Sequence, residues 1–404
     1  MRTVVRWVVV LVVVLHGLLH LLGAAKGFGW AEVSALTVPV SPVMGAAWLG
    51  SGTLVVVAGV LLARASRWFW VVGAVATLAS QAMILSSWRD AQVGSLANVV
   101  LLAAVVYGYR SQGPTSHAAE YRRGATAALA GARGETIVVT DRDLTSLPPA
   151  LADYLRGCGV VGKPRASNFR ARFHGRIRAS GDAAWMPFTG EQVNTFGPRP
   201  SRRFLMDATR GGLPVDVLHV YQEATATMRV DLCSLVPMVN AGGPELDRAE
   251  TVTVFNDLCL LAPSALVGAP IAWRSIDAHR TEGTFTNGPL TVRAELVFDQ
   301  DHQLVDFVSD DRFRAGTDGR PSRPEQWSTP IRGRGTVDGT QVVTDGDGRW
   351  RGPEGDFTYL EFHLDEIAYD VTTPGAVELV RPERVVPSSV MLGDGSAATT
   401  GLRP

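Results

Sequence analysis

The sequence has few of the features that mark an enzyme, a metalloprotein or a nucleic-acid-binding protein. Three cysteines in 404 residues, with no C-x-x-C spacing, indicate neither a disulfide framework nor a zinc site. The formal net charge of −1 gives no reason to expect nucleic acid as a partner. The complete signatures of a nucleophile elbow, a P-loop, a dinucleotide-binding unit and an H-E-x-x-H zinc protease do not occur. We therefore assign no catalytic residue, no metal and no cofactor.

Charge is also scarce in the first 110 residues, whereas residues 111–404 carry nearly all the charged side chains. This split predicts a membrane part followed by a soluble part. Four apolar stretches in the first part are each near the roughly 20 residues that a helix needs to cross the hydrocarbon core. They are residues 3–24, 43–65, 67–88 and 93–110. Three further apolar stretches follow it, and no small-residue cleavage site precedes a polar mature start, so we interpret the first stretch as a retained span rather than a signal peptide.

Basic residues near the ends of the predicted spans indicate the orientation of the chain. Those on one side of the membrane are Arg2, Arg6, Arg64, Arg67, Arg110, Arg122 and Arg123. The opposite side has only Lys26 and Arg89. The positive-inside rule then places both termini and the soluble domain in the cytoplasm. We expect a multi-pass protein of the bacterial inner (cell) membrane, with membrane lipids as partners.

The predicted spans contain few polar side chains, and these lie at a similar depth. His16 and His20 share one face of the first helix, because they are four residues apart. Gln81 and Asn98 lie in the third and fourth spans, and Asp90 lies in the turn between them. Such a cluster is typical either of hydrogen bonds between helices or of a site for a ligand, a proton or a metal ion. Haem fits poorly, since two histidines on one helix face cannot bind its opposite sides.

Strand patterns dominate the soluble part. Residues 169–178 alternate apolar or small with basic or polar side chains, which is typical of a half-buried strand. Further strand signals cover 184–189, 201–208, 214–221, 224–233, 270–277, 281–287, 290–298, 303–314, 330–337, 340–345 and 357–371. Helices are predicted over 117–130, 146–156 and 246–261.

These patterns predict four segments: a four-helix transmembrane domain (1–112), a juxtamembrane linker (113–145), an antiparallel β-rich domain (146–375) and a mobile tail (376–404). The predicted fold is a four-helix transmembrane bundle plus an α+β soluble domain. In the soluble domain a curved antiparallel sheet, like a half-barrel, surrounds one long helix. Such a sheet either packs fully on its helix or leaves an apolar cleft that suits a lipid or another hydrophobic small molecule.

Several charged and aromatic side chains are candidates for lining this cleft. Glu245 and Arg248 lie at the start of the long predicted helix, where acids also suit the helix dipole. Arg312 follows Asp310 on a predicted strand, shares a face with it, and could meet Glu245 across the cleft. Trp185, Trp273 and Trp327 are candidate walls of the core or the cleft. The histidines at 174, 219 and 363 are single residues in predicted strands, which favours structural roles.

Short motifs along most of the chain resemble a known family. In the membrane part they are His16-Gly-Leu-Leu-His20, Lys26-Gly-Phe, Ser80-Gln81, Trp88-Arg-Asp90 and Gly94-Ser-Leu-Ala-Asn98. In the soluble part they are Leu147-Pro-Pro, Tyr154-Leu-Arg, Trp185-Met-Pro-Phe with Gln192, Val236-Pro, Gly243-Pro-Glu-Leu-Asp-Arg248, Trp273, Asp311-Arg-Phe, Trp327-Ser-Thr-Pro and Tyr359.

The chain thereby resembles an uncharacterised bacterial family in which a four-span membrane domain is fused to a soluble domain of unknown function. This resemblance adds Gln192 to the candidate ligand-binding residues. In strand order the soluble part also resembles, distantly, the half-barrels of lipoprotein-carrier proteins. Those usually work outside the cytoplasm, at odds with the orientation that the basic residues indicate.

Three hypotheses of function follow. The first is a membrane protein whose soluble domain binds a lipid or another hydrophobic ligand at the cytoplasmic face. The second is a redox or transport component that uses the intramembrane cluster with a quinone or a proton. The third is an enzyme that acts on a hydrophobic substrate near Arg312 and Glu245, although no motif supports catalysis.

Overall fold

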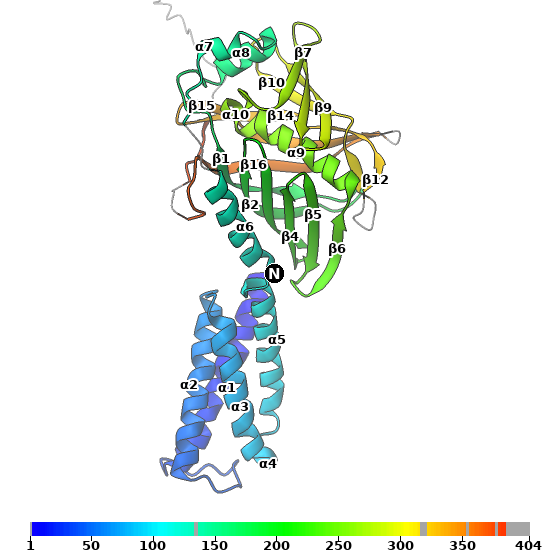
Figure 1. Ribbon diagram of the computed structural model, residues 1–404. Helices are drawn as coiled ribbons and strands as arrows, with labels where there is room; N and C mark the ends of the chain where they lie inside the picture. Colours follow the sequence, from blue (N-terminus) through cyan, green and yellow to red (C-terminus); the bar gives the residue numbers. More distant parts are fainter. Residues whose placement is uncertain (1, 133–135, 316–320, 353–354, 376–378, 385–404) are drawn as a thin grey trace, which may run out of the picture.

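A computed structural model describes residues 2–132, 136–315, 321–352, 355–375 and 379–384. The chain forms a helical bundle and a β-rich part, and Figure 1 shows helix α6 linking the two. Residues 133–135, 316–320 and 353–354, like most of the predicted tail (376–404), lie outside the described residues.

The bundle consists of four long helices and one short one. They are α1 (Arg2–Gly27), α2 (Pro42–Ala63), α3 (Phe69–Ser86), α4 (Trp88–Ala91) and α5 (Gly94–Gln112). Segments in α1, α2 and α3 are long and apolar enough to cross a membrane: Val4–Gly27, Pro42–Ala63 and Phe69–Ser86. The predicted fourth span forms α5, whose crossing of the membrane stays a prediction. Trp88–Ala91, which includes the predicted turn, is the short helix α4.

Glycines bring α1 and α2 into close contact. A Cβ atom on Gly52 would lie 2.8 Å from the carbonyl oxygen of Gly17, and one on Gly27 would lie 2.6 Å from the Cα of Gly45. Small residues that let backbones approach are the usual means of packing helices in a membrane, where apolar contacts between helices replace equally apolar contacts with lipid.

The β-rich part is built on one large antiparallel sheet. Its strands in the first half are β1 (Asn168–Ile177), β2 (Met186–Thr195), β3 (Ser201–Arg210), β4 (Leu213–Gln222), β5 (Thr225–Leu232) and β6 (Val236–Gly242). Those in the second half are β7 (Ile271–Ser275), β8 (Arg280–Asn287), β9 (Leu290–Phe298), β10 (Leu304–Ser309), β13 (Gln326–Ser328), β14 (Ile331–Val337), β15 (Thr340–Gly352), β16 (Gly355–Tyr369) and β17 (Glu383–Arg384). Strands β11 (Phe313–Ala315) and β12 (Pro321–Pro324) pair only with each other.

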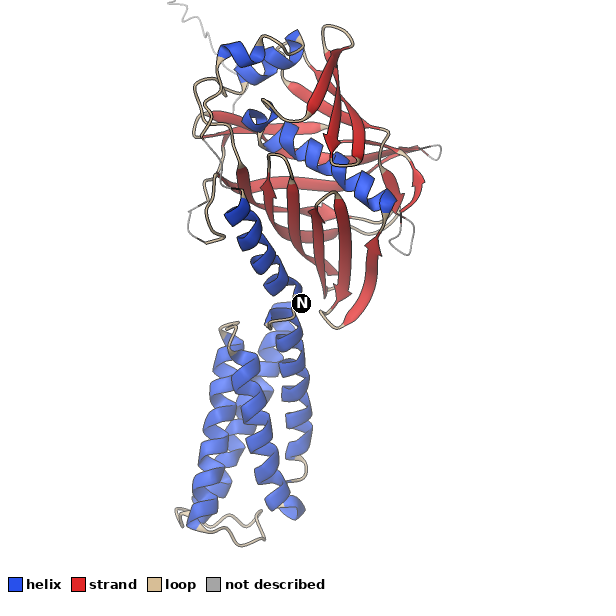
Figure 2. Cartoon of the chain, in the orientation of Figure 1, coloured by secondary structure: helices blue, strands red, loops and turns tan. Residues whose placement is uncertain are grey.

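The sheet is curved and open. Its order is β6-β5-β4-β3-β2-β1-β16-β15-β13-β10-β9-β8-β7, with β14 beside β15 and β17 beside β14. The pairing of β1 with β16 therefore joins a six-stranded meander to the later strands. Figure 2 shows helix α9 (Pro244–Leu261) lying across the curved sheet. Its buried side chains, such as Val254, Phe255 and Leu258, belong to the main core. The sequence analysis is confirmed at this level: N-terminal helices precede a large antiparallel β-sheet domain.

The predicted linker, residues 113–145, largely packs as part of the β-rich domain. Helix α6 (His117–Gly131) packs Tyr121, Ala125 and Leu129 against Val193 and Leu218 on the face of the sheet that points away from α9. Helix α7 (Asp141–Leu144) and helix α8 (Pro149–Gly157) follow, and α10 (Pro263–Leu266) comes directly after α9. The predicted helix over 117–130 therefore forms.

Several details of the secondary structure differ from the sequence prediction. The predicted strand 303–314 ends at Ser309, so Asp310 and Arg312 do not share a strand face. Helix α9 begins at Pro244 rather than Leu246, because proline suits the first turn of a helix. Strands β6 and β13 were not predicted, since both lack a clear apolar–polar alternation over enough residues.

Candidate functional site

A cavity of about 360 Å³ lies between α9 and the concave face of the sheet. Strands β1 to β5 and β16 supply most of its wall, because every second side chain of a strand points to the same face. The apolar lining residues are Phe173, Ile177, Met186, Phe188, Phe204, Met206, Ala208, Val215, Val217, Met228, Val230, Leu260, Leu261, Leu360 and Phe362. The sheet and helix therefore do not fill the space between them.

One wall of the cavity carries charges. Glu250 and Asp257 lie seven residues apart on α9, so two helical turns place them on the same face. Arg202 of β3 contacts both: its Nε donates to Asp257 at 2.9 Å, and its Nη1 lies 3.4 Å from Glu250. Gln192 and Asn194 of β2 donate to the same Asp257 oxygen at 2.7 and 2.9 Å.

Arg312 is the second buried guanidinium at this wall. Its Nη2 lies 3.4 Å from Glu250, and its charged carbon lies 4.3 Å from the centre of the Trp327 ring. The indole Nε1 of Trp327 donates to the hydroxyl of Tyr359 at 3.2 Å. Stacking on an aromatic face suits the planar and weakly hydrated guanidinium group. Arg312 therefore has a fixed position at the edge of the cavity.

Burial shifts the pKa values of the titratable side chains in this wall. It lowers the pKa of His219 to about 4, so the imidazole is neutral at pH 7 and its 3.6 Å contact with Glu250 is not an ion pair there. Burial alone would raise the pKa of Glu250, but the charges of Arg202 and Arg312 and the hydrogen bond from Thr253 hold it below its ordinary value. Burial raises the pKa of Asp257, despite the opposing effect of Arg202.

Five polar atoms on residues that line the cavity have no hydrogen-bond partner among the described residues. They are Nε of Arg312, Nε2 of His219, Oδ1 of Asn256, the hydroxyl oxygen of Thr329 and Oδ1 of Asp347. Oδ1 of Asp347 lies 2.8 Å from Nε of Arg332 as an ion pair. Leaving a buried donor or acceptor without a partner costs about 1–3 kcal/mol. The polar part of the lining therefore keeps hydrogen-bonding capacity that the described residues do not use.

The candidate residues from the sequence fall into two groups. Gln192, Arg312 and Trp327 line the cavity. Trp185 lies outside it, with the guanidinium carbons of Arg176 and Arg178 at 4.6 and 4.4 Å from its ring.

The remaining three candidates do not line the cavity either. Trp273 packs on Phe255, at 5.8 Å between ring centres. Arg248 forms an ion pair with Asp311 at 2.6 Å. Glu245 is exposed in the first turn of α9. The suggested contact of Arg312 with Glu245 is wrong, because Arg312 pairs with Glu250, which lies deeper along the helix.

Sequence reasoning missed Arg202, His219, Glu250 and Asp257. The acids were interpreted as part of a charged helix start or were not considered. One signal was available: both lie on a helix whose other residues around them are mostly apolar, and a spacing of seven puts them on one buried face. No such signal exists for Arg202 and His219, because the sheet face to which each side chain points depends on strand register.

The intramembrane cluster forms in part. Nε2 of His16 lies 3.1 Å from Oδ1 of Asn98, which also accepts from the Ser80 hydroxyl at 3.0 Å. Asn98 donates in turn to Gln81 at 2.9 Å. These contacts tie α1, α3 and α5 together, as interhelical hydrogen bonds do.

His20 and Asp90 stand apart from this network. His20 Nδ1 donates to the carbonyl of His16, and its ring packs on Trp48 at 5.1 Å. Asp90 accepts hydrogen bonds from the backbone of Thr37 and Val38, in the loop that precedes α2. The structure therefore connects His16, Gln81 and Asn98 directly, and does not bring Asp90 to them.

The β-rich part of the chain matches the model of a family of unknown function, DUF6544, over residues 137–362. Since the match covers more than half of the chain, the protein belongs to this family. No curated protein matches the chain.

Several solved structures are similar to the chain at low sequence identity. A DUF1329 family protein from Desulfovibrio piger is 14% identical, with 55% of this chain and 94% of that chain covered and a TM-score of 0.30. A LolA superfamily protein from Nitrosomonas europaea is 11% identical, with 62% and 97% covered and a TM-score of 0.30. A domain described as an outer membrane lipoprotein-sorting protein from Vibrio parahaemolyticus is 8% identical, with 52% and 87% covered and a TM-score of 0.28.

Proposed function

We propose that the soluble domain binds a lipid-class molecule in the cavity between α9 and the sheet. The observation that carries the proposal is the pairing of an extended apolar wall with unpartnered polar atoms on lining residues, among them Arg312, His219 and Asn256. An apolar pocket with a few convergent polar groups is the usual form of a small-molecule site. The domain holds this pocket next to a bundle whose helices can cross a membrane.

The polar atoms narrow the chemistry of the ligand. Nε of Arg312 is a donor, whereas Oδ1 of Asn256 is an acceptor. A head that carries both an acceptor and a donor, such as a hydroxyl or an amide, satisfies both. The wall already holds two acids and two guanidinium groups, so a strongly charged head is not needed to balance it.

The size of the cavity sets the length of the acyl chain that the ligand can carry. At about 30 Å³ per water-sized group, 360 Å³ holds roughly a dozen methylene groups. At about 0.8 kcal/mol for each buried methylene, the gross gain is on the order of 10 kcal/mol. Part of this gain offsets the loss of translational and rotational freedom on binding.

The proposal includes an orientation. The end of the bundle next to the soluble domain carries Arg6, Arg64, Arg67 and Arg110, and the positive-inside rule would place this end at the cytoplasmic side of the cell membrane. Arg110 also contacts the soluble domain, donating to the carbonyl of Ser234 at 3.1 Å. The cavity would then receive its ligand at the cytoplasmic face.

Photo-crosslinking tests the proposal. The full chain, reconstituted in lipid nanodiscs, is irradiated with a twelve-carbon monoacylglycerol that carries a diazirine on its acyl chain. We expect adducts on residues of β3, β4, β5 and α9 that line the cavity. Adducts confined to the membrane helices α1, α2, α3 and α5 would overturn the proposal.

A further inference from the structure

A cluster of two imidazoles and two carboxylates lies on the convex face of the sheet, opposite the cavity. His174 is on β1, His363 and Asp365 are on β16, and Asp345 is on β15. His174 is directly paired with His363 across β1 and β16, and His363 is directly paired with Asp345 across β16 and β15. Directly paired residues have their side chains on the same face. The strand register thus brings together residues that lie up to 191 positions apart.

An irregularity in the pairing adds Asp365 to this group. Arg172 pairs with Glu366 and the next residue, Phe173, pairs with Leu364, so Asp365 is an extra residue on β16. A bulge of this kind re-aims a side chain, and bulges are common beside functional sites. Here the bulge brings a carboxylate oxygen of Asp365 to 2.7 Å from Nδ1 of His174.

The hydrogen bonds leave one nitrogen of His363 ready to bind a metal ion. Its Nδ1 lies 2.7 Å from an oxygen of Asp345, and an ionised carboxylate only accepts, so Nδ1 carries the proton. The lone pair is then on Nε2. Asp345 is itself fixed, because its other oxygen accepts from the Thr344 hydroxyl at 2.8 Å. A carboxylate that orients a histidine through its second nitrogen is a recurring feature of zinc sites.

Gly333 makes room for this arrangement. It is paired with Asp345 across β14 and β15, and a Cβ atom on it would lie 2.6 Å from a carboxylate oxygen of Asp345. Any larger residue at this position would displace the carboxylate that orients His363.

The distances suit a small cation. Ligand atoms of His174, His363 and Asp365 all lie within 4.8 Å of one another. Tetrahedral zinc, with bonds of about 2.0–2.1 Å, needs ligand atoms roughly 3.3 Å apart. Side-chain rotation closes the difference, since the side chains of His174 and Asp365 are 56% and 39% exposed and are free to adjust.

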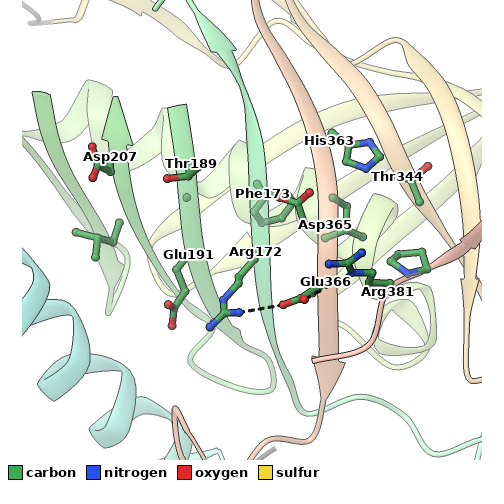
Figure 3. A pocket seen from close by; sticks show the side chains of 14 residues that line it. Arg172, Phe173, Thr189, Glu191, Asp207, Thr344, His363, Asp365, Glu366 and Arg381 are labelled. Atoms are coloured by element: carbon green, nitrogen blue, oxygen red, sulfur yellow. Dashed lines mark hydrogen bonds and ion pairs between the residues drawn. The ribbon is translucent and has the colours of Figure 1, made fainter. Parts of the chain in front are cut away.

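The surroundings leave the cluster available. Figure 3 shows His363, Asp365 and Thr344 among the residues that line a depression on this face, with Arg172 and Arg381 lower on the same wall. Both arginines contact Glu366, at 3.0 and 3.9 Å. Among the described residues, the ion-pair contacts of Asp365 and Asp345 are with the two histidines.

We propose that His174, His363 and Asp365 bind one divalent transition-metal ion of the Zn²⁺ type, with Asp345 orienting His363. Imidazole and carboxylate ligands suit such ions, and water completes the coordination. The ion would fasten β1 to β16 directly behind Phe173 and Phe362, which line the cavity on the other face. The site does not depend on lipid binding.

Zinc titration of the full chain tests the proposal. The tag-free protein in detergent is stripped with a chelator and titrated with Zn²⁺ in competition with a chromophoric indicator. We expect one equivalent to bind with a micromolar or lower Kd. His174→Ala and His363→Ala should each weaken binding at least about 100-fold, and Asp345→Asn should weaken it about 10-fold through the loss of orientation. His174 is exposed and His363 and Asp345 are half-buried, so circular dichroism checks that each variant is folded.

The control is His279→Ala, which removes an exposed histidine on a different strand connection and should leave Zn²⁺ binding unchanged. A wild-type Kd above about 1 mM would overturn the proposal. So would equal affinity in the wild type and the double variant of His174 and His363.

Discussion

Ala208→Leu tests whether the cavity binds an acyl chain. Ala208 lines the cavity from β3 and is 1% exposed. Leucine adds three carbon atoms, which at about 30 Å³ each take up roughly a quarter of the 360 Å³. About three methylene groups of a bound chain then lose their place, a loss of about 2.4 kcal/mol, or roughly 50-fold in affinity.

The measurement is equilibrium binding of a radiolabelled twelve-carbon monoacylglycerol to the full chain in nanodiscs, corrected with empty nanodiscs. The matched control is Thr227→Leu, which adds bulk to an exposed position on β5, between the lining residue Met228 and the buried Ala226. This control should bind as the wild type does.

Stability separates a blocked cavity from a damaged fold. Leucine placed in empty space fills a void, so thermal stability of the Ala208→Leu variant should stay the same or rise. Leucine forced into a packed core would cost about 1–3 kcal/mol. An unchanged affinity in a folded variant would refute the argument, and so would a loss of stability without a loss of binding.

Three further predictions concern stability. Glu250→Gln breaks a buried ion network and should lower the free energy of unfolding by about 3–5 kcal/mol. Arg172→Gln, at a side chain that is 51% exposed, should lower it by less than about 1 kcal/mol. Equal losses for the two variants in chemical denaturation would contradict this prediction. Burial lowers the pKa of His219 from 6.5 to about 4, so the unfolded state binds more protons between these values. Stability should therefore fall as the pH drops from about 6.5 toward 4, and His219→Gln should flatten the profile. His16→Ala removes the hydrogen bond to Asn98 and should lower the stability of the bundle by about 1–2 kcal/mol, measured by thermal unfolding in detergent. Leu19→Ala, at a residue that is 61% exposed, should lower it less.

The helices and the sheet class could be predicted because their signals are local. The length of the apolar stretches predicts α1 to α3, and the alternation of apolar and polar residues predicts most of the strands. The strand ending at Ser309 shows the limit. The prediction extended the strand through Asp310 and Asp311, which are residues that strands disfavour. In the structure the strand ends before them, and Asp311 forms an ion pair with Arg248.

The sites could be predicted only where a residue's role does not depend on register. Trp327 was a candidate wall of the core or the cleft, and Gln192 was a candidate through a family resemblance; both line the cavity. The pairing of His174 with His363 depends on the register between β1 and β16, although the two residues lie 189 positions apart in the sequence. A one-residue slip would place either side chain on the other face, so each histidine alone carries no such information.

The most direct test of lipid binding is native mass spectrometry of the full chain released gently from detergent. We predict that the wild type retains a small molecule with an acyl chain, and that Ala208→Leu retains less of it or a shorter one. The Thr227→Leu control should retain the same molecule as the wild type. A wild-type protein with no retained lipid, or equal retention of the same lipid by Ala208→Leu, would contradict the account.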